Sequence, residues 1–100
     1  MLFRSAEGME VFTFPGSVKG QQIAQAVLRS MLATCPGHKD RGVKEANFAV
    51  LRLTAMPAVL VECEFLTNPK QLSFLMDPAN QRAIATAIGG GIKSEKYPSA

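Results

Sequence analysis

The chain has 100 residues, which is the length of about one small domain. Its apolar fraction of 47% and charged fraction of 19% are ordinary for a folded globular chain, so they argue against disorder. The net charge is +3 and the basic residues form no cluster, so nucleic-acid binding is not expected. No run approaches the ~20 apolar residues of a membrane span, so no transmembrane segment is expected.

The first half of the chain predicts a strand, a helix and a loop. Met9–Phe14 is short, rich in β-branched and aromatic residues, and stopped by Pro15-Gly16, as strands commonly are. From Gly20 onward the apolar residues repeat at helical spacing, which predicts one buried helix face made of Ile23, Ala24, Val27, Leu28, Met31 and Leu32. Pro36-Gly37 ends this helix and opens a polar loop over His38–Lys44.

Two further apolar runs follow. Phe48–Leu53 is compatible with a strand or with a short helical turn, and periodicity alone does not decide between them. Ala58–Leu66 is almost continuously apolar and is interrupted only by Glu62 and Glu64. Continuous hydrophobicity of this kind predicts a strand that is covered on both faces.

The last third of the chain predicts two helices. Asn68-Pro69 and Asp77-Pro78 each place an N-cap residue before a proline at the first helical position. Gly89–Gly91 weakens the second helix and is expected to be its end or a point of tight packing. The order of strands and helices predicts an α/β fold, with a partial mixed or parallel sheet and flanking helices. Residues 1–7 are expected to be an unstructured or junction segment and residues 94–100 a polar tail.

Glu62 is the main candidate for chemistry. A carboxylate late in a buried strand is costly unless it is paired, hydrogen-bonded or bound to a metal. Ligand sites of open α/β sheets lie beyond the carboxyl ends of parallel strands, where Glu62 and Glu64 would fall on one face. The two are compatible with an acid–base pair, part of a metal site, or one functional and one solvated group. From spacing alone, a salt-bridged or solvent-facing glutamate is the favoured interpretation of Glu62.

Several motifs together resemble one enzyme family. Pro57–Glu62, followed by Phe65–Pro69, resembles the signature of zinc-dependent N-acetylmuramoyl-L-alanine amidases of the type-three family. Other segments resemble further elements of that family in the right order, namely Gly8–Phe12, Arg41–Lys44, Val50–Arg52 and Ile84–Ile92. The resemblance spans residues 8–93, so this range is expected to be the C-terminal part of an amidase catalytic domain.

The resemblance implies that the parent enzyme hydrolyses the amide bond between N-acetylmuramic acid and L-alanine in peptidoglycan. It implies that Glu62 is the general base, which takes a proton from a zinc-bound water. Arg41 is a weak candidate for binding stem-peptide carboxylates, although a solvated loop arginine is the plainer interpretation. The family usually has glycine where this chain has Glu64, a carboxylate that either raises the pKa of Glu62 by repulsion or, as we favour, turns to solvent.

The family's zinc ligands, two histidines and a glutamate, belong to the region upstream of Met9–Phe14. This chain has one histidine, His38, at a position that does not match a ligand, whereas a zinc site needs about three protein ligands. We therefore expect no metal ligand in this chain, which would be an inactive fragment of a zinc enzyme. The alternative is a non-catalytic peptidoglycan-binding or regulatory relic. A weaker third interpretation, an unrelated α/β hydrolase using Glu62 and Glu64 as a pair, is disfavoured by the ordered motifs.

The first residues say little about localisation. Met1–Gly8 lacks the apolar core and cleavage site of a signal peptide, which would argue for a cytoplasmic protein only if Met1 were the natural start. The resemblance implies a parent that is secreted, periplasmic, associated with the cell wall, or a phage lysin.

Overall fold

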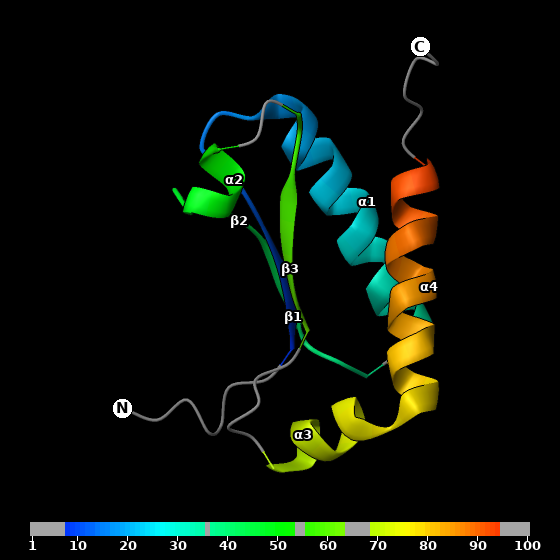
Figure 1. Ribbon diagram of the computed structural model, residues 1–100. Helices are drawn as coiled ribbons and strands as arrows, with labels where there is room; N and C mark the ends of the chain where they lie inside the picture. The colour runs from blue at the N-terminus through cyan, green and yellow to red at the C-terminus, as the bar shows by residue number, and fades with distance from the viewer. Residues whose placement is uncertain (1–7, 36, 54–55, 64–68, 95–100) are drawn as a thin grey trace.

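A three-stranded mixed sheet forms the centre of the fold. The computed structural model describes residues 8–35, 37–53, 56–63 and 69–94. Its strands are β1 (Met9–Thr13), β2 (Asp40–Glu45) and β3 (Val59–Cys63). Their order is β2-β1-β3, with β1 parallel to β2 and antiparallel to β3 (Figure 1). The prediction of an α/β fold with a mixed sheet is confirmed.

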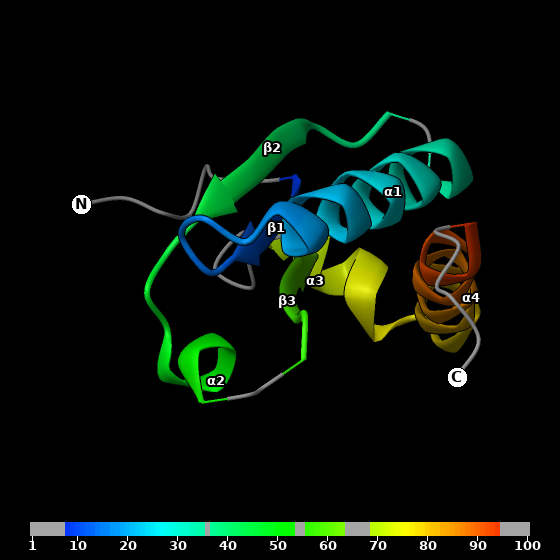
Figure 2. The same cartoon turned by 90° about the horizontal axis from the view of Figure 1, so that it is seen from above.

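Two long helices lie on one side of this sheet (Figure 2). They are α1 (Val18–Thr34), which links the parallel strands, and α4 (Pro78–Ser94), which packs against α1. The shorter helices are α2 (Ala49–Arg52) and α3 (Pro69–Met76). The two views show α2 on the side of the sheet opposite α1 (Figures 1 and 2). Among the described elements, the second face of the sheet is therefore covered by a helix only at one end.

The alternation of side chains along β1 separates a core face from an open face. Met9 and Val11 are fully buried and join the hydrophobic core formed with α1 and α4. The other core residues of these helices include Ile23, Ala24, Val27, Leu28, Met31, Ile84 and Ala87, which confirms the predicted apolar face of α1. Ser17 caps α1 by accepting a hydrogen bond from the Gly20 amide at 3.0 Å.

The expected polar loop over His38–Lys44 is wrong, because Asp40–Glu45 forms strand β2. Helix α1 returns the chain beside β1, whose backbone groups need hydrogen-bond partners. At the edge of the sheet, β2 keeps its polar side chains partly or fully exposed. It therefore forms without the apolar pattern by which a strand is recognised in sequence.

The run Phe48–Leu53, left open by the sequence, contains helix α2 with Phe48 at its N-cap. The Phe48 ring packs edge-on against Phe12 of β1, with centroids 5.3 Å apart and planes at 78°. This contact holds α2 against the open face of the sheet. Other large apolar side chains in and after α2 are exposed, namely Val50, Leu53 and Met56.

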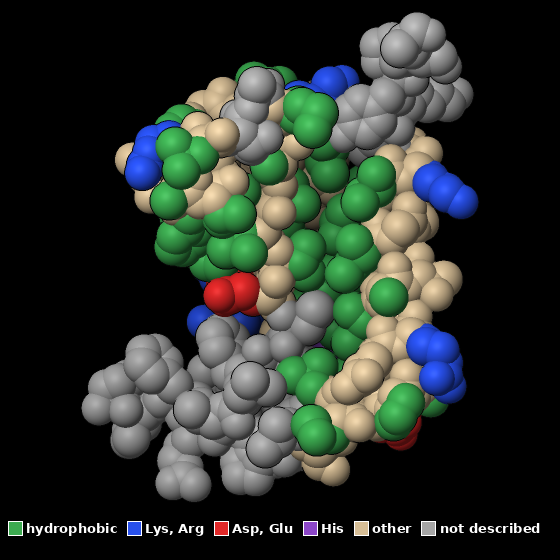
Figure 3. Space-filling view, viewed as in Figure 1, with side chains coloured by type: hydrophobic (Ala, Val, Ile, Leu, Met, Phe, Trp, Pro, Cys, Tyr) green, Lys and Arg blue, Asp and Glu red, His purple; other side chains and the backbone are tan. Residues whose placement is uncertain are grey.

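The expected strand over Ala58–Leu66 is present as β3, with its last residues outside the described part of the chain. Full cover on both faces is not found. From Val59 to Glu62 the side chains are only half-buried. Hydrophobic side chains are visible over α2 and between β3 and α4 (Figure 3). The first area lies beside the open face of the sheet, whereas the second lies on the side of α1, where Val59 and Val61 pack against the core at the edge of the sheet (Figure 2).

The C-terminal helices begin where the sequence predicts. Asp77 caps α4 by accepting a hydrogen bond from the Ala79 amide at 2.9 Å. Helix α4 continues through Gly89–Gly91 to Ser94, so the glycines do not end it. Gly91 instead lies so close to α1 that a Cβ atom there would be 2.6 Å from the Val27 Cα. Tight packing is therefore the correct alternative for this segment. No helix in the described ranges is long and apolar enough to cross a membrane.

We expect Gly91→Ala to destabilise the chain, because the added methyl group meets the Val27 backbone, which cannot move as a flexible side chain would. The loss should be about 1–3 kcal/mol, as for other overpacked positions. Gly89→Ala is the matched control, because nothing lies within 4 Å of its added Cβ. It should gain up to about 1 kcal/mol from helix propensity. Urea unfolding of both variants measures the difference, and equal stabilities would contradict the packing of α4 on α1.

Candidate catalytic site

Glu62 lies directly across the sheet from a second glutamate. The antiparallel register pairs Glu62 of β3 with Glu10 of β1, so the two side chains share one face. This face is opposite the one on which Met9 and Val11 pack against α1. Glu10 is only 5% exposed and Glu62 is half-buried. The other carboxylate considered from the sequence, Glu64, lies outside the described residues.

Two cations of β2 bind the buried member of this pair. The Lys44 ammonium donates a hydrogen bond to the Glu10 Oε1 atom, and the Arg41 Nε lies 3.9 Å from the same oxygen. Arg41 and Glu62, the two site residues singled out in the sequence, are thus brought together through Glu10. Arg41 is part of a strand and an ion pair rather than a solvated loop residue. Its contact with a substrate stays a prediction.

An irregularity in β2 places both cations on the same side. Met9 pairs with Asp40 and Val11 with Val43, so β2 contains one residue more than β1 over this stretch. Residues three apart in a regular strand, such as Arg41 and Lys44, would point to opposite faces. The extra residue changes this alternation. Gly42, with φ of +85°, occupies the bulge and donates its amide to the Asp40 Oδ1 at 2.8 Å.

The surroundings of Glu62 favour its protonated form. Burial raises the pKa of Glu62, and the hydrogen bond to Glu10 and the negative charge of Glu10 raise it further. Lys44 acts in the other direction and lowers this pKa, but it is the smallest of the four contributions. A glutamate with a raised pKa is a stronger base once ionised, which suits it to accept a proton during hydrolysis.

The position of this pair in the sheet differs from the expected one. Sequence reasoning placed Glu62 at the carboxyl ends of parallel strands, but β3 runs antiparallel to β1. Glu62 therefore lies beside the amino-terminal part of β1, at the end opposite to the carboxyl ends of β1 and β2. The expectation was wrong because it assumed the direction of β3, which depends on how the chain returns to the sheet.

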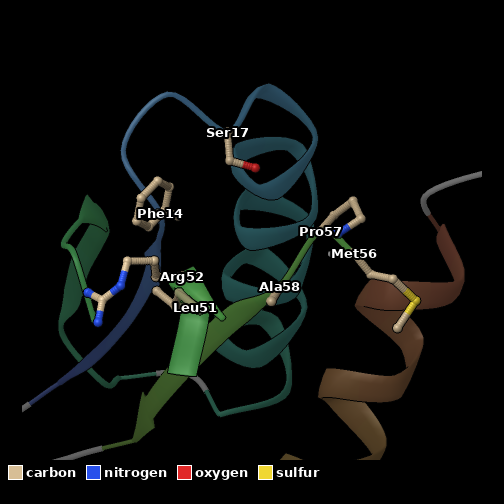
Figure 4. A pocket seen from close by; sticks show the side chains of 7 residues that line it. All are labelled: Phe14, Ser17, Leu51, Arg52, Met56, Pro57 and Ala58. Carbon is tan, nitrogen blue, oxygen red and sulfur yellow. The ribbon is translucent and has the colours of Figure 1, made fainter. Parts of the chain in front are cut away.

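A surface pocket occupies the other end of the sheet. Figure 4 shows the side chains that line it, which are Phe14, Ser17, Leu51, Arg52, Met56, Pro57 and Ala58. Thr13 pairs with Val59 at this end, three residues along the strand from the Glu10–Glu62 pair, or roughly 10 Å away. The lining contains no carboxylate, and Arg52 donates a hydrogen bond to the Asn47 side chain. The pocket is thus separate from the candidate catalytic group.

The described residues do not fit a zinc site. None of them form a group of three or more His, Cys, Asp and Glu side chains that could hold a metal. The two carboxylates present share their surroundings with the positive charges of Lys44 and Arg41, which oppose a further cation. His38 is half-buried against the Phe74 ring, with centroids 4.4 Å apart.

Comparison with known proteins identifies the family. A family model described as N-acetylmuramoyl-L-alanine amidase matches residues 3–94. The chain belongs to this family. The uncharacterized protein YqiI of Bacillus subtilis is 35% identical over 92 residues, which cover 90% of this chain and 44% of YqiI. The amidase AmiC of Neisseria meningitidis is 46% identical over 56 residues, covering 56% of this chain and 13% of AmiC.

The fold is also that of the family. The crystal structure of N-acetylmuramoyl-L-alanine amidase from Clostridium difficile 630 superposes with a TM-score of 0.85 at 33% identity. The match covers 89% of this chain and 48% of the C. difficile amidase. The chain therefore spans less than half the length of these relatives, and the described elements correspond to one part of the amidase fold.

Sequence reasoning missed Glu10. The residue was visible as a lone charge inside the apolar strand Met9–Phe14, at a position that alternates with Met9 and Val11. An isolated charge in a short strand is usually solvent-exposed, so this signal was weak. The Glu10 carboxylate can be buried because Lys44 and Arg41 neutralise its charge. Both cations lie on β2, a strand that the sequence did not predict.

Glu62→Gln should stabilise the chain at neutral pH. Since the pKa of Glu62 is raised in the fold, its protonated form stabilises the native state below the unfolded pKa of about 4.3, and this stability is lost as the pH rises through the folded pKa. A glutamine cannot ionise, and its amide can still donate to Glu10. The denaturation midpoint of the variant should exceed that of the parent at pH 7, and the two should converge below about pH 4.

Glu45→Gln, on the same sheet but not paired with Glu10, controls for loss of one negative charge. A gain that does not depend on pH would contradict the assignment.

Proposed function

We propose that residues 8–93 are the C-terminal part of a peptidoglycan amidase catalytic domain, in which Glu62 is the general base. The reaction is hydrolysis of the bond between the lactyl carbonyl of N-acetylmuramic acid and the L-alanine nitrogen. The observation that carries this proposal is the half-buried Glu62, whose pKa is raised, on the sheet face opposite the helical core. Membership of the amidase family supports the choice of substrate.

The chemistry required of Glu62 is a pair of proton transfers. As a carboxylate it accepts a proton from the attacking water while the new C–O bond forms. As the C–N bond breaks, the same carboxyl gives its proton to the nitrogen of the leaving L-alanine. A group with a raised pKa is suited to both steps, because it is a better base than an ordinary glutamate and still a sufficient acid.

The family resemblance also implies zinc, and we propose that its ligands come from outside the described residues. The C. difficile amidase is about twice as long as the part that this chain matches. The exposed apolar side chains at α2 and the half-buried β3 are the surfaces that a further part of the domain would cover. By this proposal the 100-residue chain alone is inactive.

A fusion tests the function directly. The part of the C. difficile amidase that this chain does not match is joined ahead of residues 8–94, and release of stem peptides from purified peptidoglycan is measured with added zinc. The fusion should cleave the amide bond, and Glu62→Gln should lower kcat by about 10²–10⁴-fold. Glu45→Gln, a matched loss of one carboxylate on β2, should leave kcat unchanged.

The isolated chain separates this proposal from its rival. With zinc added it should neither bind the metal tightly nor release stem peptides, and such release would show that the chain is a complete enzyme. If the fusion is inert while the isolated chain sediments with cell walls regardless of Glu62→Gln, the chain is instead a non-catalytic peptidoglycan-binding relic.

A further inference from the structure

We infer that Glu10 is a positioning residue for Glu62: the two carboxyl groups share one proton across the β1–β3 pair, and the cations of β2 fix the negative charge on Glu10. This inference rests on the proposed role of Glu62 as general base. It concerns a residue that does not itself meet the substrate, since Glu10 is 5% exposed.

The register of β1 and β3 brings the side chains of Glu10 and Glu62 together. Directly opposed residues of antiparallel strands have Cβ atoms about 4.5–5.5 Å apart, which is close enough for two glutamate side chains to meet. Glu10 raises the pKa of Glu62 both as a hydrogen-bond partner and as a negative charge. A hydrogen bond between two carboxyl groups requires a proton on one of them, because two carboxylates offer only acceptors and repel each other.

The positive charges lie beside only one member of the pair. Lys44 and Arg41 both approach Oε1 of Glu10, and Lys44 donates a hydrogen bond to it. Glu10 is therefore the member that keeps the negative charge, because its ion pairs offset the cost of burying it. The proton is left to Glu62, whose carboxyl is the more exposed of the two.

The bulge in β2 places both cations on the side of Glu10. Without the extra residue at Gly42, the alternation of β2 would place Arg41 and Lys44 on opposite faces. The bulge, with the positive φ of Gly42 and its hydrogen bond to Asp40, lets both reach Glu10. Among the described residues, the charged groups that act on Glu62 are thus Glu10 on β1 and Lys44 on β2, with Arg41 acting through Glu10.

For the proposed reaction, this arrangement holds the Glu62 carboxyl in place and favours both its gain and its loss of a proton. Glu10 orients the Glu62 carboxyl by accepting its proton in a hydrogen bond. When Glu62 is ionised, the negative charge of Glu10 favours protonation of Glu62. In the proposed reaction this proton comes from the attacking water. Glu10 performs no bond-making step, and removing it should change when Glu62 is protonated rather than whether the substrate binds.

The test is a titration of the Glu62 side chain in the intact 100-residue chain, followed by NMR of ¹³C-labelled glutamate carboxyl groups. The Glu62 signal is the one lost in Glu62→Gln. In Glu10→Gln its midpoint should move to lower pH, because the repulsion and the shared proton are both removed.

A Glu62 midpoint that is the same in the parent chain and in Glu10→Gln overturns the inference. If Glu10→Gln does not fold, Glu10→Asp decides the matter, since it keeps the charge that Lys44 and Arg41 bind but draws the carboxyl back from Glu62 by one methylene group. Its Glu62 midpoint should also fall, and a midpoint that stays in place or rises in that variant likewise overturns the inference. Glu45→Gln, which removes a carboxylate on β2 that bonds Gly16 and Gln21 instead, is the control and should not move the signal.

The active fusion adds a second readout. There Glu10→Gln should move the acid limb of the kcat/KM profile to lower pH without raising KM, whereas a merely structural role for Glu10 would lower activity equally at all pH values. An inactive fusion would count against the proposed function, while the NMR titration would still decide the role of Glu10. The two hypotheses therefore fail separately.

Discussion

The pairing of β1 with β3 is the constraint on which the rest of the molecule depends. β1 is the middle strand and binds both neighbours, and its core face supplies Met9 and Val11 to the helical layer. The same pairing puts Glu10 opposite Glu62 on the other face. Since side chains alternate strictly along a strand, the register that buries the apolar set also fixes the carboxyl pair. Stability and chemistry are thus set by a single alignment of five residue pairs.

The carboxyl pair is costly to hold, and the structure around it offsets that cost. A charge as buried as Glu10 needs both a countercharge and a hydrogen bond. Lys44 provides both and Arg41 adds a second charge, from an edge strand whose bulge allows them to lie on one side. Buried ion pairs contribute little net stability compared with apolar packing. The cluster is therefore better explained by what it does to Glu62 than by what it adds to the fold.

The two faces of the sheet are covered to different extents. On one face α1 and α4 form a core that includes the close approach of Gly91 to Val27. On the other, Phe12 meets Phe48, but the apolar side chains Val50 and Leu53 at α2 stay exposed. The open face is thus that of a layered domain with one layer uncovered, in agreement with a match to less than half of the C. difficile amidase.

The sequence by itself determined the elements that local chemistry controls. The helical repeat of α1, the starts of α3 at Pro69 and of α4 at Pro78, the strands β1 and β3, and the family motif around Glu62 could all be read from neighbouring residues. Only the tertiary structure decided that Asp40–Glu45 is a strand, that β3 runs antiparallel to β1, and that Glu10 faces Glu62. These features depend on contacts between residues far apart in the chain, where backbone pairing and charge neutralisation outweigh weak local preferences.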